Sequence, residues 1–221
     1  NEHKDVLNYT KIPSRKFRET DKSPMINWNW MLEGNSSNTN FRKYAYQGLD
    51  GLKTGHTDEA GYCFTGTAER NGMRLISVVM GTGPKEENRF IETRKVLDYG
   101  FNNFEKKQVL AGKTEIDSLK TVNIKKGVAT EVPVVTESGL ELIVKKGAAA
   151  DQFQITAEAL TEESKLTAPI TVGQVLGTAK LTYEGKEYKV NMVASEDVEK
   201  GSWIRLFFRA IKNFFVDTLT G

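Results

Sequence analysis

The fold is decided by residues 50–81, which read DGLKTGHTDEAGYCFTGTAERNGMRLISVVMG. Within this stretch, two runs rich in β-branched and aromatic residues, 62–68 and 73–80, lie on either side of an Asn71-Gly72 pair. Asn-Gly between two such runs is the strongest short-range signal of a β-hairpin, because both residues tolerate the positive φ angles of its tight turn. The sequence therefore predicts an antiparallel strand pair, and we expect the preceding strand to carry Lys53-Thr54-Gly55.

A helix is expected after this hairpin, over residues 84–104. Pro84 lies in the expected first turn and Gly100 near the end, which are the usual signals of a helix start and stop. Acidic residues follow Pro84 and suit the positive end of the helix dipole. The apolar positions of this segment are Phe90, Ile91, Val96, Leu97 and Phe101.

The segment before residue 40 is polar and irregular, and Pro13 and Pro24 interrupt it. It contains one apolar cluster, made of Trp28, Trp30, Met31 and Leu32. We expect this cluster to pin a long loop onto the core of its own domain. The alternative is a binding patch on the surface.

From about residue 105 the sequence changes to short β-rich runs separated by Gly, Pro or charged turns. Glu184-Gly185-Lys186 is a second hairpin signal. Regular short strands of this kind predict a small all-β domain, a sandwich or a barrel. Because it carries no histidine, cysteine or dense carboxylate cluster, we expect it to be structural and not catalytic.

The last segment, residues 202–221, has the pattern of a basic amphipathic helix. At about 100° per residue its bulky apolar side chains share one face and its cations lie opposite. Such a helix is typical of the membrane interface, with its cations toward anionic headgroups; docking onto a protein core is the alternative. The predicted membrane-binding residues are Trp203, Phe207, Phe208, Ile211, Phe214, Phe215, Arg205, Arg209 and Lys212.

Composition narrows the possible functions further. The 221 residues carry 31 Lys plus Arg and 29 Asp plus Glu, a net charge of +2 that gives no strong field for nucleic acid. With one cysteine and two histidines, we expect neither a disulfide framework nor a metal site, and we expect no cofactor. The sequence also contains no apolar run of the roughly 18 residues that a transmembrane helix needs.

The Lys53-Thr54-Gly55 segment carries the chemistry, although the tripeptide alone is a weak signal and fits a strand that ends in a glycine turn. On a strand, Lys53 can place an ammonium beside a serine nucleophile, and Thr54 can donate a hydroxyl to a carboxylate. Gly55 lacks a Cβ, so a substrate backbone can approach the strand edge.

Residues 50–81, with the helix, the β-rich domain and the terminal helix that follow, resemble the low-molecular-mass penicillin-binding proteins. These are serine-type D-alanyl-D-alanine carboxypeptidases, and the resemblance is to the penicillin-binding protein 5 type of Gram-positive bacteria. It implies an α/β (α+β) C-terminal part of a transpeptidase-like catalytic domain over residues 1–105. An all-β sandwich domain over 106–197 and an amphipathic membrane-anchor helix over 198–221 would follow.

The resemblance also implies roles for single residues. Lys53 would polarise the site, Thr54 and Gly55 would help to bind the substrate, and the backbone N–H of His56 would contribute to an oxyanion hole. Arg89 would lie near the terminal carboxylate of the substrate; the alternative is a solvated charge on the helix. The implied partners are peptidoglycan stem peptides, β-lactam antibiotics and an anionic surface on the extracytoplasmic face of the cell membrane.

The nucleophile of this family is the serine of a Ser-x-x-Lys motif. No serine of this chain is followed three positions later by a lysine, and Ser36-Ser37-Asn38 is a chance match to the second motif of the family. Since the chain begins at Asn1 without a leader, we expect a fragment whose upstream part holds the nucleophile. A non-catalytic peptidoglycan-binding scaffold is the main alternative; a related β-lactamase is disfavoured, because those enzymes generally lack the second domain and the anchor.

Overall fold

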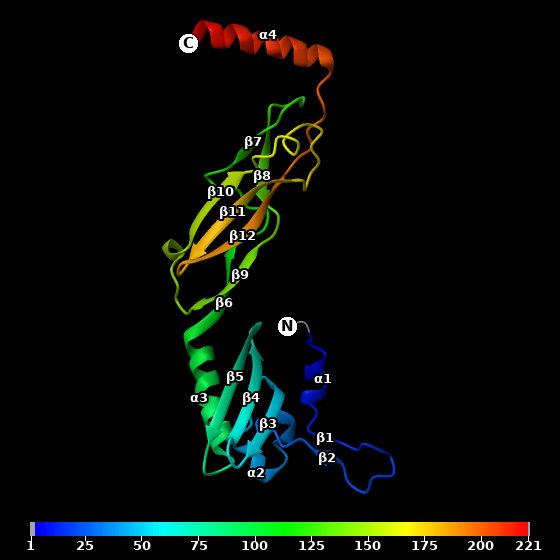
Figure 1. Cartoon of the computed structure of the whole chain (residues 1–221), viewed down its shortest axis with the longest axis vertical. Helices are drawn as coiled ribbons and strands as arrows, with labels where there is room; N and C mark the ends of the chain where they lie inside the picture. Colours follow the sequence, from blue (N-terminus) through cyan, green and yellow to red (C-terminus); the bar gives the residue numbers. More distant parts are fainter. Residues whose placement is uncertain (1–2, 221) are drawn as a thin grey trace. The chain divides into compact units, whose positions relative to one another are not determined.

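The computed structural model describes residues 3–220, and within the last helix it describes side chains as far as residue 212 (Figure 1). The chain divides into two compact units. The first comprises residues 1–106 and 143–146, and the second comprises residues 107–142 and 147–221.

The first unit is built on a three-stranded antiparallel sheet in the order β3-β4-β5. These strands are β3 (Leu49–Thr57), β4 (Gly61–Arg70) and β5 (Met73–Thr82). Asn71 and Gly72 form the turn between β4 and β5, with φ angles of 50° and 71°. The predicted hairpin is therefore confirmed, and so is the preceding strand, because β3 pairs with β4 along its length.

Helix α3 (Asn88–Asn103) packs on one face of this sheet. Its side chains Phe90, Leu97 and Phe101 are buried, and with Phe64, Ala68 and Met73 of the strands they belong to the core of the unit. The helix begins four residues later than Pro84, so the expectation that Pro84 occupies its first turn is wrong. Residues 84–87 instead form a turn, in which the side chain of Asn88 donates to the carbonyl of Gly83 at 2.6 Å.

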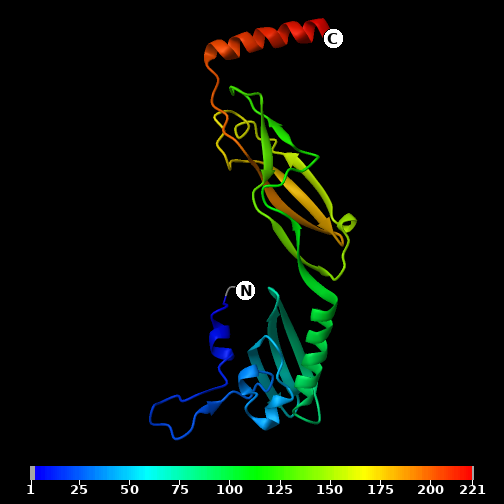
Figure 2. The same ribbon diagram turned by 180° about the vertical axis from the view of Figure 1, so that it is seen from behind.

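The N-terminal elements are short: α1 (Val6–Thr10), β1 (Ser14–Arg15), β2 (Met25–Ile26), η1 (Glu33–Asn35) and α2 (Thr39–Arg42). Helix α1 lies on the face of the sheet opposite α3, as both views show (Figures 1 and 2). Met31 and Leu32 are buried in the core, and the ring of Trp30 stacks on Phe41 at 5.1 Å. The prediction that this cluster pins the loop is confirmed for these three residues, whereas Trp28 is 58% exposed.

The second unit is β-rich, as predicted. Its main sheet has five strands in the order β10-β11-β12-β8-β7. They are β7 (Thr121–Asn123), β8 (Glu131–Thr136), β10 (Gln154–Ala159), β11 (Val175–Tyr183) and β12 (Lys186–Ala194). The predicted turn between β11 and β12 is confirmed, with Glu184 and Gly185 at φ angles of 46° and 75°.

Two further strands, β6 (Phe104–Leu110) and β9 (Leu140–Lys145), pair with each other, and a short 3-10 helix η2 (Ala150–Gln152) follows. The core of the second unit is aliphatic and draws side chains from nearly every strand; it includes Leu110, Val122, Val132, Val134, Ala179, Val190 and Met192. Helix α4 (Trp203–Thr220) ends the chain. Among the residues that the structure describes, no helix combines the length and the apolar character needed to cross a bilayer.

Candidate active site

The residues Lys53, Thr54 and Gly55 lie together on β3, which is an edge strand of the described sheet. An edge strand leaves part of its backbone N–H and C=O groups without a neighbouring strand, so an extended peptide can pair with it. A Cβ built on Gly55 would meet no atom within 4 Å, which leaves open space beside the strand at this position. Lys53 is exposed, and its ammonium donates to the carbonyl of Thr54.

His56 follows on the same strand with an exposed side chain. Its ring lies 4.2 Å from the ring of Tyr62, its partner across the β3–β4 pair. Tyr62 is thus part of the site, and the sequence analysis did not identify it. The signal that could have identified Tyr62 is the strand register: if Thr57 pairs with Gly61 across the turn, His56 must pair with Tyr62. The predicted role of the His56 backbone N–H stays a prediction.

Helix α3 brings Arg89 to this strand. Arg89 is only 4% exposed, and its Nη1 donates to the carbonyl of Gly55 at 3.3 Å. Its Nη2 donates to the carboxylate of Glu86, three residues earlier in the turn that precedes α3. The guanidinium also lies over two rings, with its central carbon 5.4 Å from the centre of Tyr62 and 4.8 Å from that of Phe90. Arg89 is therefore not a solvated charge on the helix surface.

Burial lowers the pKa of Arg89, and the nearby Glu86 carboxylate opposes this effect. An arginine has so high a pKa that it keeps its charge at neutral pH even so. Its Nε atom is buried and has no hydrogen-bond partner among the described residues. The strand edge is consequently backed by the buried guanidinium of Arg89, which is ion-paired with Glu86 and keeps an unused donor, and the exposed ammonium of Lys53 lies on the same strand as Gly55. Such an arrangement suits an anionic group at the end of an extended ligand.

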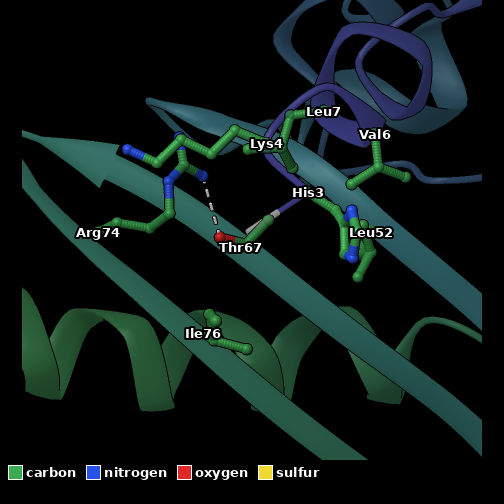
Figure 3. Close-up of a pocket in the computed structure, with 8 residues that line it drawn as sticks. All are labelled: His3, Lys4, Val6, Leu7, Leu52, Thr67, Arg74 and Ile76. Atoms are coloured by element: carbon green, nitrogen blue, oxygen red, sulfur yellow. Dashed lines mark hydrogen bonds between the residues drawn. The ribbon is translucent and has the colours of Figure 1, made fainter. Parts of the chain in front are cut away.

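A separate hollow of about 380 Å³ lies on the α1 side of the sheet and does not include Lys53 (Figure 3). It is lined by His3, Lys4, Val6, Leu7, Leu52, Thr67, Arg74 and Ile76. Arg74, the cation that the strands contribute to this lining, is already neutralised, because it makes two contacts of 2.8 Å with the Asp50 carboxylate and donates to Thr67 Oγ1 at 3.0 Å. We therefore do not assign the polar chemistry to this hollow.

The apolar face of the sheet continues beyond this hollow along β5. Ile76, Val78 and Met80 alternate along that strand and are 66%, 64% and 73% exposed. Contiguous exposed apolar side chains of this kind are typical of a surface that packs against further protein.

Helix α4 carries the predicted membrane-binding residues. Trp203, Phe207, Phe208 and Ile211 are 75%, 56%, 65% and 37% exposed. Arg205 and Lys212 are also exposed, whereas Arg209 is half-buried against the second unit. The side chains of Phe214 and Phe215 lie outside the described residues.

Two families of known proteins match this chain, one over most of the first unit and one over most of the second. Residues 2–83 match a family described as D-alanyl-D-alanine carboxypeptidase. Residues 104–200 match the family described as penicillin-binding protein 5, C-terminal domain. The first match contains the Lys53-Thr54-Gly55 strand edge, and the second contains the strands of the β-rich unit but not α4.

Two curated relatives illustrate the similarity. The chain is 34% identical over 176 residues to the D-alanyl-D-alanine carboxypeptidase DacF of Bacillus subtilis, which covers 79% of this chain and 43% of that protein. It is 30% identical over 213 residues to DacA of Escherichia coli K12, covering 96% of this chain and 49% of that protein. The chain thus spans about half the length of these relatives.

Solved structures show the same relationship. Penicillin-binding protein 5 of Haemophilus influenzae matches with a TM-score of 0.59 and 28% identity, over 88% of this chain and 51% of the other. A peptidoglycan synthesis regulatory factor, PBP3, of Streptococcus pneumoniae matches with a TM-score of 0.65 and 26% identity, over 90% of this chain and 53% of the other.

Proposed function

The chain belongs to the D-alanyl-D-alanine carboxypeptidase family, and from this we propose that it forms the substrate-binding edge of such an enzyme. The complete protein would remove the terminal D-Ala from stem pentapeptides of peptidoglycan through an acyl-serine intermediate. The observation that carries the proposal is the contact between Arg89 and Gly55, which joins a buried cation to the open edge that bears Lys53 and Thr54.

In the proposed reaction, the peptide lies along β3 and its terminal carboxylate faces Thr54 and Arg89. The serine hydroxyl attacks the carbonyl carbon of the penultimate D-Ala, and its proton passes to a base. The peptide C–N bond then breaks, and D-Ala leaves after its nitrogen accepts a proton. Water hydrolyses the resulting ester and regenerates the serine.

This chain would supply binding and electrostatics to that reaction, while the serine and its base come from residues outside it. The ammonium of Lys53 favours the negative charge that develops in the tetrahedral intermediate. The backbone N–H of His56 is proposed as one donor to the oxyanion, where a single donor typically contributes a factor of about 10²–10³ in rate.

A labelled penicillin tests the proposal, because a β-lactam would acylate the same serine. We expect the complete protein to become covalently labelled and the 221-residue chain alone to remain unlabelled. A complete protein that carries Ser-x-x-Lys, is folded and never labels would refute carboxypeptidase activity. An upstream sequence without that motif would favour the non-catalytic scaffold.

We further propose that α4 attaches the protein to the extracytoplasmic face of the cell membrane. The exposed apolar side chains near the start of α4, with Arg205 and Lys212 beside them, support an interfacial helix. Binding to vesicles that contain anionic lipid, weakening as salt is added, is the expected result. Absence of binding at low salt would contradict this attachment.

A further inference from the structure

The side chain of Arg209 is half-buried, and its guanidinium is hydrogen-bonded to the turn at residues 126–128. Its Nη1 donates to the carbonyl oxygen of Gly127 and its Nη2 to that of Val128, both at 3.0 Å. The two outer nitrogens of one planar group thus donate hydrogen bonds to two successive carbonyls of one turn. Lysine cannot reproduce this fork, because its ammonium is a single point on a flexible stem.

The start of α4 is fastened to the same turn by its backbone. The N–H of Gly201 donates to the carbonyl of Lys126 at 2.8 Å, and that of Val128 donates to the carbonyl of Glu199 at 2.8 Å. A Cβ on Gly201 would lie 3.2 Å from the oxygen of Gly127 and 3.0 Å from Cδ2 of Leu206, so the close approach depends on glycine. The 126–128 turn and the residues at the start of α4 are therefore closely packed and hydrogen-bonded to each other.

The direction of the apolar face follows from helix geometry. With 3.6 residues per turn, Arg209 lies about 170° around the axis from the mean direction of the exposed apolar side chains. Those side chains are Trp203, Ile204, Phe207, Phe208 and Ile211. Because Arg209 is bound to the 126–128 turn, the opposite, apolar side of the helix is turned away from that turn.

We propose that Arg209 is a positioning residue, which locks α4 to the 126–128 turn and so presents the apolar face of the helix to an anionic lipid surface. In this arrangement Arg205 and Lys212, and not Arg209, contact lipid phosphates. The lipid part of this inference rests on the proposed membrane attachment, whereas the lock itself does not.

The lock is tested in solution with the charge-conserving variant Arg209→Lys and the matched control Arg205→Lys. Hydrogen exchange of the amides over residues 203–212 is measured by mass spectrometry. We expect exchange to accelerate about fivefold or more in R209K, because the paired hydrogen bonds to the turn are lost. R205K should match the parent protein, and an R209K protein that also matches it would overturn the lock.

Presentation to lipid is tested with the same proteins and vesicles of equal parts phosphatidylglycerol and phosphatidylcholine. We expect R209K to bind roughly fivefold more weakly despite its unchanged charge, because a loosened helix must be ordered on binding. Arg15→Lys, at an exposed position of the first unit that has no proposed part in lipid binding, should bind like the parent protein. Arg205→Gln should lose about fivefold, the typical contribution of one cation near an anionic surface.

The other outcomes distinguish the positioning role of Arg209 from the membrane attachment of α4. Faster exchange in R209K with unchanged vesicle binding would overturn the presenting role and leave a purely structural lock. Failure of every protein to bind vesicles would refute the membrane attachment, and the exchange measurement alone would then decide the role of Arg209.

Discussion

The carbonyl oxygen of Gly55 accepts a hydrogen bond from Nη1 of Arg89 at 3.3 Å, across 34 positions of sequence. This contact joins helix α3 to the last residue of the Lys53-Thr54-Gly55 segment. Because Arg89 is buried and Gly55 borders open space, the contact places a shielded charge directly behind an accessible backbone. We expect the buried side, Arg89, to stabilise the fold and the site, and the open side, Gly55, to admit the substrate. Separate substitutions distinguish the two.

Replacement of Arg89 by lysine is expected to weaken both the fold and the site. Lysine keeps the charge but lacks the planar, forked guanidinium that reaches Gly55 and Glu86 from two nitrogens, so we expect a loss of about 1–2 kcal/mol in the free energy of unfolding. In the complete protein we also expect at least a roughly tenfold lower rate of penicillin acylation. Urea unfolding and labelling kinetics measure the two effects. The exposed Arg15→Lys is the control, and equal behaviour of both variants would contradict the assigned role.

Replacement of Gly55 by alanine is expected to leave stability unchanged within about 0.5 kcal/mol, because the added methyl meets no neighbour within 4 Å. The same methyl would occupy the space through which substrate approaches, so acylation of the complete protein should fall sharply. Gly66→Ala is the contrasting variant, since its Cβ would lie 2.8 Å from Ser77 Oγ and 3.0 Å from Phe64 Cε1. That variant should cost about 1–3 kcal/mol. Unchanged acylation in a folded G55A protein would refute the proposed path of the substrate.

Tyr46 gives the first unit a pH dependence at high pH. Burial, followed by the hydrogen bond that its hydroxyl donates to Asp98 at 2.8 Å, raises the pKa of Tyr46 to about 12. A raised pKa means that the phenol holds its proton more tightly in the folded state than in the unfolded state, so protonation stabilises the folded state. This stabilisation is complete below pH 10 and is lost as the pH rises from about 10 to 12.

Unfolding free energies measured from pH 9 to 12 check this expectation. The variant Tyr46→Phe should lose less stability across that interval than the parent protein, by on the order of 1–2 kcal/mol. Tyr99→Phe is the control, because that ring is 64% exposed. Identical pH profiles for Y46F and the parent protein would contradict the link.

Part of the fold of both units follows from local chemistry and could be predicted from sequence. Asn71-Gly72 and Glu184-Gly185 specify their hairpins because their φ angles are positive in the folded chain. The sequence pattern places the start of α3 too early, since Pro84 is typical of a first helical turn but precedes the helix in the structure. The strand order β10-β11-β12-β8-β7 depends on pairing between distant segments, so no local signal specified it.

The candidate site divides in the same way. Lys53, Thr54 and Gly55 are adjacent in sequence, so a motif identifies them. The position of Tyr62 beside His56 follows only from the pairing register of β3 and β4. Helix periodicity places Arg209 among the cations of α4 and so predicts that it binds lipid. Its bonds to Gly127 and Val128 join residues more than 80 positions apart, so periodicity could not reveal them.

The most direct measurement of the central claim is D-alanine release from a peptide that ends in D-Ala-D-Ala, using the complete protein and its Lys53→Ala variant. Lysine 43, which lies outside the strand edge, provides the matched control Lys43→Ala. If the strand edge binds and polarises the substrate, K53A should lower kcat/KM by about 10²-fold or more, while K43A stays close to the parent protein. A folded K53A protein that releases D-alanine at the parental rate would contradict the account.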